Sequence, residues 1–301
     1  MLDVCLLGCG GMLPLPSRFL SSLLLRLNGR MLLVDCGEGT QITMRELGWG
    51  FVNLDFILIT HFHADHVAGL PGLLLSLSNY GRTQEVTLVG PVGLGQVVNS
   101  LKVIAPELGF SLKFIEFSTE DKYAAEIMLG EFRVSALPLS HSLPCLGYSI
   151  SIPRKGKFDP RKAIALNIPI EYWKILQEGK SFLCYKPEMV LGPPRKGLKV
   201  SYITDTLPIG TIPDFVFGSD LFICEGMYGD EEYKEKGETN FHMTFADAAK
   251  LAVAAEVEQL WLTHFSPALT APENYLERTK EIFDNTVVGH DRMTKTLKFV
   301  D

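Results

Sequence analysis

The chain contains no apolar run that approaches the roughly 20 residues a membrane-spanning helix needs. Its first basic residue is Arg18, so the N-terminus also lacks the charged flank of a signal peptide. Its six cysteines include no Cys-x-x-Cys pair, which argues against a zinc knuckle, a redox dithiol and a secreted disulfide scaffold. From these absences we expect a cytoplasmic protein with reduced thiols and no membrane partner.

Positive charge is also scarce, except in one segment. The 301 residues are 47% hydrophobic and 21% charged with a net charge of −7, which is typical of a globular protein and argues against a general nucleic-acid coat. Residues 154–199 nevertheless hold eleven basic and only four acidic residues. An acidic body with one basic segment indicates a polyanion that docks at a defined place. A lysine-rich solvated loop is the alternative interpretation.

The hydrophobic pattern predicts strands that are followed by helices. The expected strands cover residues 2–7, 22–27, 31–35, 55–60, 85–89, 132–137, 147–152, 198–204, 221–225 and 259–263. The expected helices cover residues 65–77, 94–105, 160–176, 244–257 and 272–284. This order favours the α/β class and a four-layer αββα sandwich, one domain over residues 1–301. The basic segment interrupts the pattern, so we expect an inserted arm at residues 153–195.

Four side chains that can bind metal lie within six positions, directly after the strand expected at 55–60. They are His61, His63, Asp65 and His66. The spacing of His61 and His63 places both imidazoles on one side of an extended segment, while Asp65 and His66 begin the next helix and can face a second ion. Composition alone would produce such a hexapeptide in roughly one chain in several thousand. The pattern therefore predicts a metal site rather than scattered surface histidines.

Further ligands must come from other parts of the chain, because a zinc ion takes at least three protein ligands. His141, Asp205 and His264 each follow an expected strand, where ligands from neighbouring strands can meet in one rigid site. Imidazoles and carboxylates suit zinc, and two ions about 3.5–4 Å apart can stabilise both the attacking and the leaving oxygen of a displacement.

Several motifs resemble one known family. The hexapeptide HFHADH resembles the motif of the metallo-β-lactamase superfamily. Together with DCGEGTQ, the continuation VAGLPGLL, LGPPRKG before KVSYITDT, and LTHFSP, it resembles ribonuclease Z, the tRNA 3′-processing endonuclease, over nearly the whole chain. The resemblance implies the metallo-β-lactamase fold and a homodimer that binds precursor tRNA. The implied activity is zinc-dependent hydrolysis that removes the 3′ trailer and leaves a 3′-hydroxyl on the tRNA.

The resemblance also implies a role for each site residue. Two zinc ions per subunit would be held by His61, His63 and His141 on one side and by Asp65, His66 and His264 on the other, with Asp205 bridging them. Asp65 would also orient the attacking water and take its proton. Glu225 and His242 match a pair thought to transfer protons at the phosphate, although their neighbours differ from the family pattern. Glu225 could alternatively orient a zinc ligand.

Substrate-binding residues are expected on a loop and on the arm. Arg18 fits a phosphate contact in the N-terminal loop, where Phe19 replaces the usual asparagine and is either a base-stacking or a core residue. The stretch GKFDPRKAIALNIP resembles the flexible arm with which the family grips the tRNA body. Tyr172 and Trp173 are either aromatic residues at the tip of this arm or, as we expect, residues that pack against the arm's own helix. The basic residues expected to contact substrate there are Lys155, Lys157, Arg195 and Lys196.

Three other functions are weighed against this interpretation. The Gly-Pro step usual in the family's arm is missing, which leaves a hydrolase of small phosphodiesters or other esters as the alternative. A diiron redox enzyme is disfavoured because position 63 is histidine and no flavin domain follows. A non-catalytic RNA-binding protein is disfavoured because the ligand set is complete.

Overall fold

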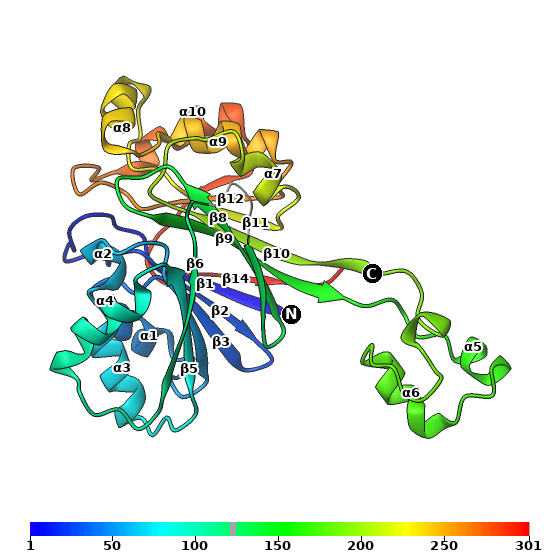
Figure 1. Ribbon diagram of the computed structural model, residues 1–301. Helices are drawn as coiled ribbons and strands as arrows, with labels where there is room; N and C mark the ends of the chain where they lie inside the picture. The colour runs from blue at the N-terminus through cyan, green and yellow to red at the C-terminus, as the bar shows by residue number, and fades with distance from the viewer. Residues whose placement is uncertain (121–124, 301) are drawn as a thin grey trace.

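The computed structural model describes residues 1–120 and 125–300. Two seven-stranded sheets face each other, and helices cover the outer face of each (Figure 1). The first sheet has the strand order β14 (Met293–Leu297), β1 (Leu2–Gly8), β2 (Ser22–Leu27), β3 (Arg30–Val34), β4 (Leu54–Leu58), β5 (Val86–Pro91), β6 (Leu112–Phe117). The second has the order β13 (Thr286–Val288), β12 (Leu260–Thr263), β11 (Leu221–Glu225), β10 (Arg195–Ile203), β9 (Cys145–Arg154), β8 (Phe132–Leu139), β7 (Ala125–Leu129). The expected αββα sandwich is confirmed.

The helices form two outer layers. The first sheet carries α1 (Thr40–Leu47), α2 (Ala64–Val67), α3 (Leu70–Asn79), α4 (Leu94–Leu101) and the 3₁₀ turn η1 (Lys102–Ile104). The second sheet carries α7 (Ile212–Val216), η3 (Glu231–Tyr233), α8 (Lys234–Asn240), α9 (Phe245–Ala254), η4 (Pro272–Tyr275) and α10 (Leu276–Ile282). Within residues 1–120 and 125–300, no helix is long and apolar enough to cross a bilayer.

Alternation along β1 explains why the first sheet is buried on both faces. Leu2, Val4 and Leu6 point into the core between the two sheets, whereas Cys5 and Leu7 point into a second core beneath the outer helices. Successive side chains of a strand point to opposite faces, so a strand made almost entirely of apolar residues contributes side chains to both cores. The strands β1, β2 and β3 pair antiparallel, and β3 to β6 then pair in parallel.

Two helices that the pattern predicts as continuous are each divided. The helix predicted at 65–77 is divided into α2 and α3 at Gly69, where an added Cβ would lie 2.1 Å from the carbonyl oxygen of Gly37. This close approach of two backbones admits only glycine. The helix predicted at 160–176 is divided into α5 (Pro160–Ala165) and α6 (Ile170–Gln177), because Pro169 cannot continue a helix.

The pattern missed α1 and the edge strand β6. The buried residues of α1 are only Thr40, Thr43 and Met44, so its sequence has no clear apolar stripe. No residue of β6 is fully buried, because it lies at the edge of its sheet. Weak burial gives a weak hydrophobic period in both cases.

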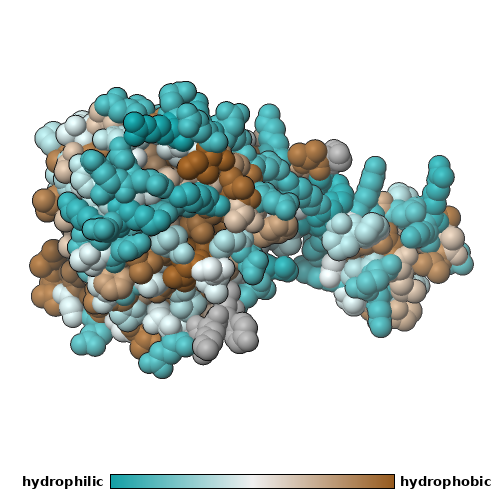
Figure 2. Space-filling model, turned by 90° about the horizontal axis from the view of Figure 1, so that it is seen from above, coloured by the Kyte–Doolittle hydropathy of each residue, from teal (hydrophilic) through white to brown (hydrophobic). Residues whose placement is uncertain are grey.

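The basic segment forms an arm that extends away from the body (Figure 1). The strands β9 and β10 pair as far as Arg154 and Arg195 and form its two-stranded stalk. The knob beyond them contains α5, α6, η2 (Pro187–Met189) and a small core of Ala163, Ile168, Leu176 and Val190. Figure 2 shows the knob standing clear of the body on a narrow neck. Tyr172 and Trp173 pack against this small core as expected.

Candidate metal centre

Metal-ligand candidates from both sheets converge where the strands end. His141 follows β8, Asp205 follows β10 and His264 follows β12. The strands β10 and β12 both run parallel to β11, so their carboxyl ends lie at the same edge of the sheet. Asp205 and His264 have φ angles of 53° and 58°, in the left-handed region. Such sharp turns are uncommon for residues other than glycine and concentrate at functional sites.

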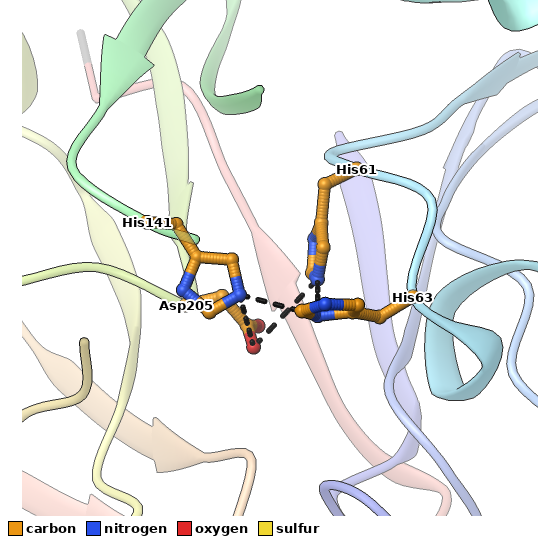
Figure 3. Close-up of side chains that lie close together, drawn as sticks. All are labelled: His61, His63, His141 and Asp205. Carbon is orange, nitrogen blue, oxygen red and sulfur yellow. Dashed lines mark hydrogen bonds and ion pairs between the residues drawn. The ribbon is translucent and has the colours of Figure 1, made fainter. Parts of the chain in front are cut away.

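His61, His63, His141 and Asp205 form the first group (Figure 3). Their potential ligand atoms all lie within 4.8 Å of one another. The Nδ1 atom of His63 lies 2.9 Å from the Nε2 atom of His61 and 3.2 Å from that of His141. Burial lowers the pKa of all three imidazoles, and that of His61 falls well below its usual value. Neutral imidazoles whose ring nitrogens face one another suit a metal ion.

Asp65, His66 and His264 form the second group, with ligand atoms again within 4.8 Å of one another. The Nε2 atoms of His66 and His264 are 3.2 Å apart, and Oδ2 of Asp65 lies 3.3 Å from Nε2 of His264. Burial by itself raises a carboxyl pKa, but hydrogen bonds from His264 and His66 outweigh it and hold the pKa of Asp65 well below its usual range. Asp65 is therefore ionised at neutral pH, as a metal-binding carboxylate must be.

The two oxygen atoms of Asp205 face different groups. Its Oδ2 lies 3.2 Å from Nε2 of His66 and 3.3 Å from Nε2 of His264. Its Oδ1 lies 3.8 Å from Nε2 of His61 and 3.9 Å from Nε2 of His141. A carboxylate in this position can contribute one oxygen to each of two neighbouring ions.

The donor set fits a metal ion by its chemistry. The buried Nδ1 atoms of His141 and His264 have no hydrogen-bond partner in the described parts of the chain. The Nε2 atoms of the same two rings contact other members of the cluster. Convergent imidazole and carboxylate groups with few outside partners are characteristic of metal ligands. The cluster of histidine and aspartate residues is therefore a candidate metal-binding site whose groups could hold a metal ion.

Two residues that support the cluster were not singled out by the sequence reasoning. Oδ2 of the buried Asp35 lies 2.7 Å from Nδ1 of His66, and Oδ1 accepts a hydrogen bond from the backbone N–H of Thr60 at 2.8 Å. Asp35 thus orients a ligand ring. At Gly11 an added Cβ would lie 2.6 Å from the ring of His264. The position of Asp35 directly after β3, at the start of DCGEGTQ, was the available signal for its role.

Glu225 and His242 are brought together as a pair. Glu225 ends β11 and is fully buried, and its Oε2 lies 3.0 Å from Nδ1 of His242. Its Oε1 accepts a hydrogen bond from the backbone N–H of Thr206 at 2.7 Å. Burial opposes a charge on His242, but the Glu225 carboxylate outweighs it and raises the pKa of His242 to about 9. His242 lines the cavity over the cluster, whereas Glu225 lies behind it.

The structure does not place the predicted substrate-binding residues at the metal cluster. The guanidinium of Arg18 donates to the carbonyl oxygens of Ser266 at 3.3 Å and Leu269 at 2.9 Å. Phe19 lies against Gly39.

Three of the four predicted arm residues have contacts within the protein. The ammonium of Lys196 pairs with Asp220 at 3.0 Å and also with Glu258. Nε of Arg195 donates to the carbonyl oxygen of Lys155 at 3.0 Å, and the ammonium of Lys155 donates to that of Glu178. Lys157 is exposed on the knob. Substrate contacts by Arg18 and these four arm residues stay predictions.

A cavity of about 630 Å³ opens over the cluster and is lined by members of both ligand groups, among them His63, His141, Asp65 and His264. Met12 and Leu13 of the N-terminal loop form one wall, and residues on and near α8, including Lys236 and Asn240, form another. The backbone N–H of Met12 donates to Oδ2 of Asp65 at 2.7 Å, so this loop is attached directly to the site. The cavity is large enough for a substrate to reach both ligand groups.

Known proteins that resemble this chain share its full length. Ribonuclease Z of Clostridium acetobutylicum is 51% identical over 306 residues, with 99% of each chain covered. Ribonuclease Z of Lachnoclostridium phytofermentans is 52% identical over 303 residues, with the same coverage. The chain belongs to the ribonuclease Z family. As a ribonuclease Z family member it is a metal-dependent hydrolase, and the family resemblance deduced from its motifs is confirmed.

More distant matches describe the fold of this ribonuclease Z family member. Human tRNase Z, short form, superposes with a TM-score of 0.71 at 24% identity, covering 99% of this chain and 100% of the other. The metallo-β-lactamase fold protein YhfI of Bacillus subtilis gives 0.69 at 19% identity, covering 98% of both chains. The model of the family described as anti-Pycsar protein Apyc1 matches residues 2–148, a part that ends before Asp205 and His264. The metallo-β-lactamase fold is thereby confirmed.

Proposed function

We propose that this protein is an endoribonuclease that removes the 3′ trailer from precursor tRNA. The support is the identity of about half its residues to ribonuclease Z proteins over nearly the full length. The observation that carries the proposal is the pair of ligand groups beneath one cavity, with an oxygen of Asp205 facing each group. Such a double site suits the in-line displacement at phosphorus by which phosphodiesters are hydrolysed.

We propose that the cluster holds two zinc ions. His61, His63 and His141 would hold one, and Asp65, His66 and His264 the other, with Asp205 between them. When bound, such ions supply Lewis-acid charge at the scissile phosphate and make the attacking water more acidic. The mixture of imidazole and carboxylate ligands favours zinc over magnesium, which prefers oxygen ligands.

The residues of the chain itself would handle two protons. Asp65, ionised and lining the cavity, takes a proton from the water whose oxygen bonds to phosphorus. The bond from phosphorus to the 3′ oxygen breaks, so the tRNA keeps a hydroxyl and the trailer keeps the phosphate. The Nδ1 atom of His242 is hydrogen-bonded to Glu225, which leaves its Nε2 atom available. We propose that Nε2 of His242 donates the proton that the leaving oxygen takes up.

We also propose that residues 1–301 form one catalytic domain and that the arm at 153–195 is a tRNA-binding surface. The knob is separate from the body and carries exposed cations, which supports this role. They include Lys157, Arg161, Lys162 and Lys174. The knob extends away from the body of the molecule (Figure 1), as expected for a homodimer whose arm reaches tRNA bound by the partner subunit. Light scattering on the purified protein tests the dimer, since a monomer at working concentration would contradict it.

A cytoplasmic location is supported by the cysteines. All six are free thiols, and five of them are buried. Reduced thiols are typical of cytoplasmic proteins. Fractionation of cells that make the protein tests this point, because recovery outside the cytoplasm would contradict it.

A paired assay tests the proposed activity. We expect the wild-type protein with added zinc to cut a 3′-extended precursor tRNA once, just after the discriminator base. His63→Ala removes one ligand of the first group and should reduce this cleavage by at least about a thousandfold without changing the melting temperature by more than a few degrees. His290→Ala is the matched control, because His290 is exposed and outside the cluster.

A small chromogenic phosphodiester serves as the second substrate. Turnover of this diester without any cut in the tRNA would contradict the tRNA assignment and favour a hydrolase of small phosphodiesters. Full cleavage of tRNA by a well-folded, metal-free His63→Ala protein would contradict the metal mechanism itself.

A further inference from the structure

A second, smaller cavity branches from the cavity over the metal cluster. It has a volume of about 90 Å³, and both cavities are bordered by Tyr228, Lys236, Ser266 and Ala268. A pocket that encloses a whole small ligand has a volume of at least a few hundred Å³. The side cavity therefore has room for one planar group that belongs to a larger molecule in the main cavity.

Three tyrosines are among the residues that line the side cavity. Tyr228 and Tyr233 lie nearly parallel, with an angle of 23° and 5.8 Å between ring centroids. Tyr275 also lines this cavity and lies against Gly229, where an added Cβ would be 2.4 Å from its ring. Asn240 donates to the hydroxyl of Tyr228 at 3.3 Å and fixes that ring. Tyr233 remains 40% exposed and so offers a ring surface to a ligand.

One lysine lies where the two cavities meet. The ammonium of Lys236 is 5.4 Å from the centroid of the Tyr228 ring. Among the described residues that line the main cavity, Lys236 is the single lysine or arginine, and the ionised carboxylates there are those of Asp65 and Asp205. Lys234, on the same helix α8, instead pairs with Asp247 at 3.7 Å and borders neither cavity. Of these two lysines of α8, only Lys236 therefore lies at the cavity over the metal cluster.

We propose that Lys236 and the tyrosine-lined side cavity bind one RNA nucleotide next to the scissile phosphate. Lys236 contacts the phosphate that flanks the cut, and the tyrosine rings stack on the base. Stacking on aromatic rings tolerates any base because every base has a π face, so this subsite selects for an unstacked nucleotide and not for its sequence. The inference rests on the proposed function and adds the subsite that the RNA chain occupies beside the metal centre.

The charge of Lys236 is tested by cleavage of precursor tRNA at several salt concentrations. We expect Lys236→Gln to raise KM about tenfold at low salt. The slope of log KM against log salt should fall by about 0.7, the value for one lost phosphate contact on a single strand. Lys234→Gln is the matched control and should keep the wild-type slope. An unchanged slope in Lys236→Gln would overturn the inference, because a purely structural lysine does not alter salt dependence.

The base contact is tested with an abasic nucleotide placed directly 5′ or directly 3′ of the cut. One of these substrates should lower kcat/KM of the wild type about tenfold, as expected for one lost base stack. With the normal substrate, Tyr233→Leu should lower kcat/KM by about the same factor. With the abasic substrate, the same variant should lower kcat/KM no further. Tyr80→Leu is the control, because Tyr80 is also exposed and stacked on an aromatic ring, Phe51, in the other outer layer.

The possible results separate this inference from the proposed function. If the wild type cuts precursor tRNA while Tyr233→Leu and the abasic nucleotide lower kcat/KM independently, the two factors multiply. In that case the proposed subsite is wrong and the proposed function stands. If the wild type does not cut the tRNA at all, both are wrong.

Discussion

At the residue scale, the metal centre depends on groups that never touch an ion. Asp35 illustrates this, because it is fully buried and its carboxylate is hydrogen-bonded to the backbone N–H of Thr60 and to Nδ1 of His66. A carboxylate behind a ligand histidine fixes the orientation of the ring and makes the ligand more basic. The requirement for glycine at position 11 has the same origin, since the ring of His264 fills the space that a side chain would take.

The substitution Asp35→Asn should weaken zinc binding by about 10- to 100-fold, because asparagine has no negative charge and only one acceptor oxygen, so it cannot serve both the ring of His66 and the backbone N–H of Thr60. Competition with a chromogenic zinc chelator measures this affinity. Asp3→Asn is the control, because Asp3 pairs with Arg26 in β1 and β2 and is not part of the cluster. Equal zinc affinity in the Asp35→Asn and wild-type proteins would show that the contact is only structural.

At the scale of elements, the arm can be separated from the chemistry. The stalk strands β9 and β10 are still paired at Arg154 and Arg195, and the knob between them has its own core. The knob therefore contributes little to the two large cores of the body. Its lysines at the stalk are held by contacts within the protein, whereas those on the knob itself are exposed.

Replacing residues 155–194 by Asn-Gly should leave a folded body, since this dipeptide forms a tight turn between antiparallel strands. We expect kcat/KM for precursor tRNA to fall at least about tenfold relative to the rate with a small phosphodiester, because several phosphate contacts are lost. Circular dichroism confirms the fold. If the ratio of the two rates equals that of the wild type, the arm does not bind tRNA.

At the scale of the whole molecule, the metal centre joins the two halves of the sandwich. His61, His63, Asp65 and His66 follow a strand of the first sheet, while the remaining ligands, including Asp205, follow strands of the second. An ion held by both sets connects the sheets at one edge and binds only the folded state. Such a ligand stabilises the fold by about 2.7 kcal/mol when its concentration is 100 times its dissociation constant.

Chelation followed by stepwise addition of zinc should therefore raise the melting temperature by several degrees and saturate at two ions per chain. Differential scanning calorimetry and elemental analysis measure the two quantities. The His63→Ala protein should retain only the ion of the second group. Saturation of the wild type at one ion per chain would contradict the proposed pair.

The sequence by itself determined the fold class, the arm and the seven candidate ligands. This was possible because HFHADH is a local motif. In addition, His141, Asp205 and His264 each follow a hydrophobic run that predicts a strand. The short helix α1 and the edge strand β6 were missed because they bury too little apolar surface to give a clear period.

Only the tertiary structure decided how these residues act together. It showed that the two oxygen atoms of Asp205 face different ligand groups and that Lys236, not Lys234, meets the cavity. It also showed that Lys196 is paired with Asp220. The physical reason is distance along the chain: secondary structure follows from neighbouring residues, whereas these contacts join residues that are far apart in the sequence and meet only when the tertiary structure has formed.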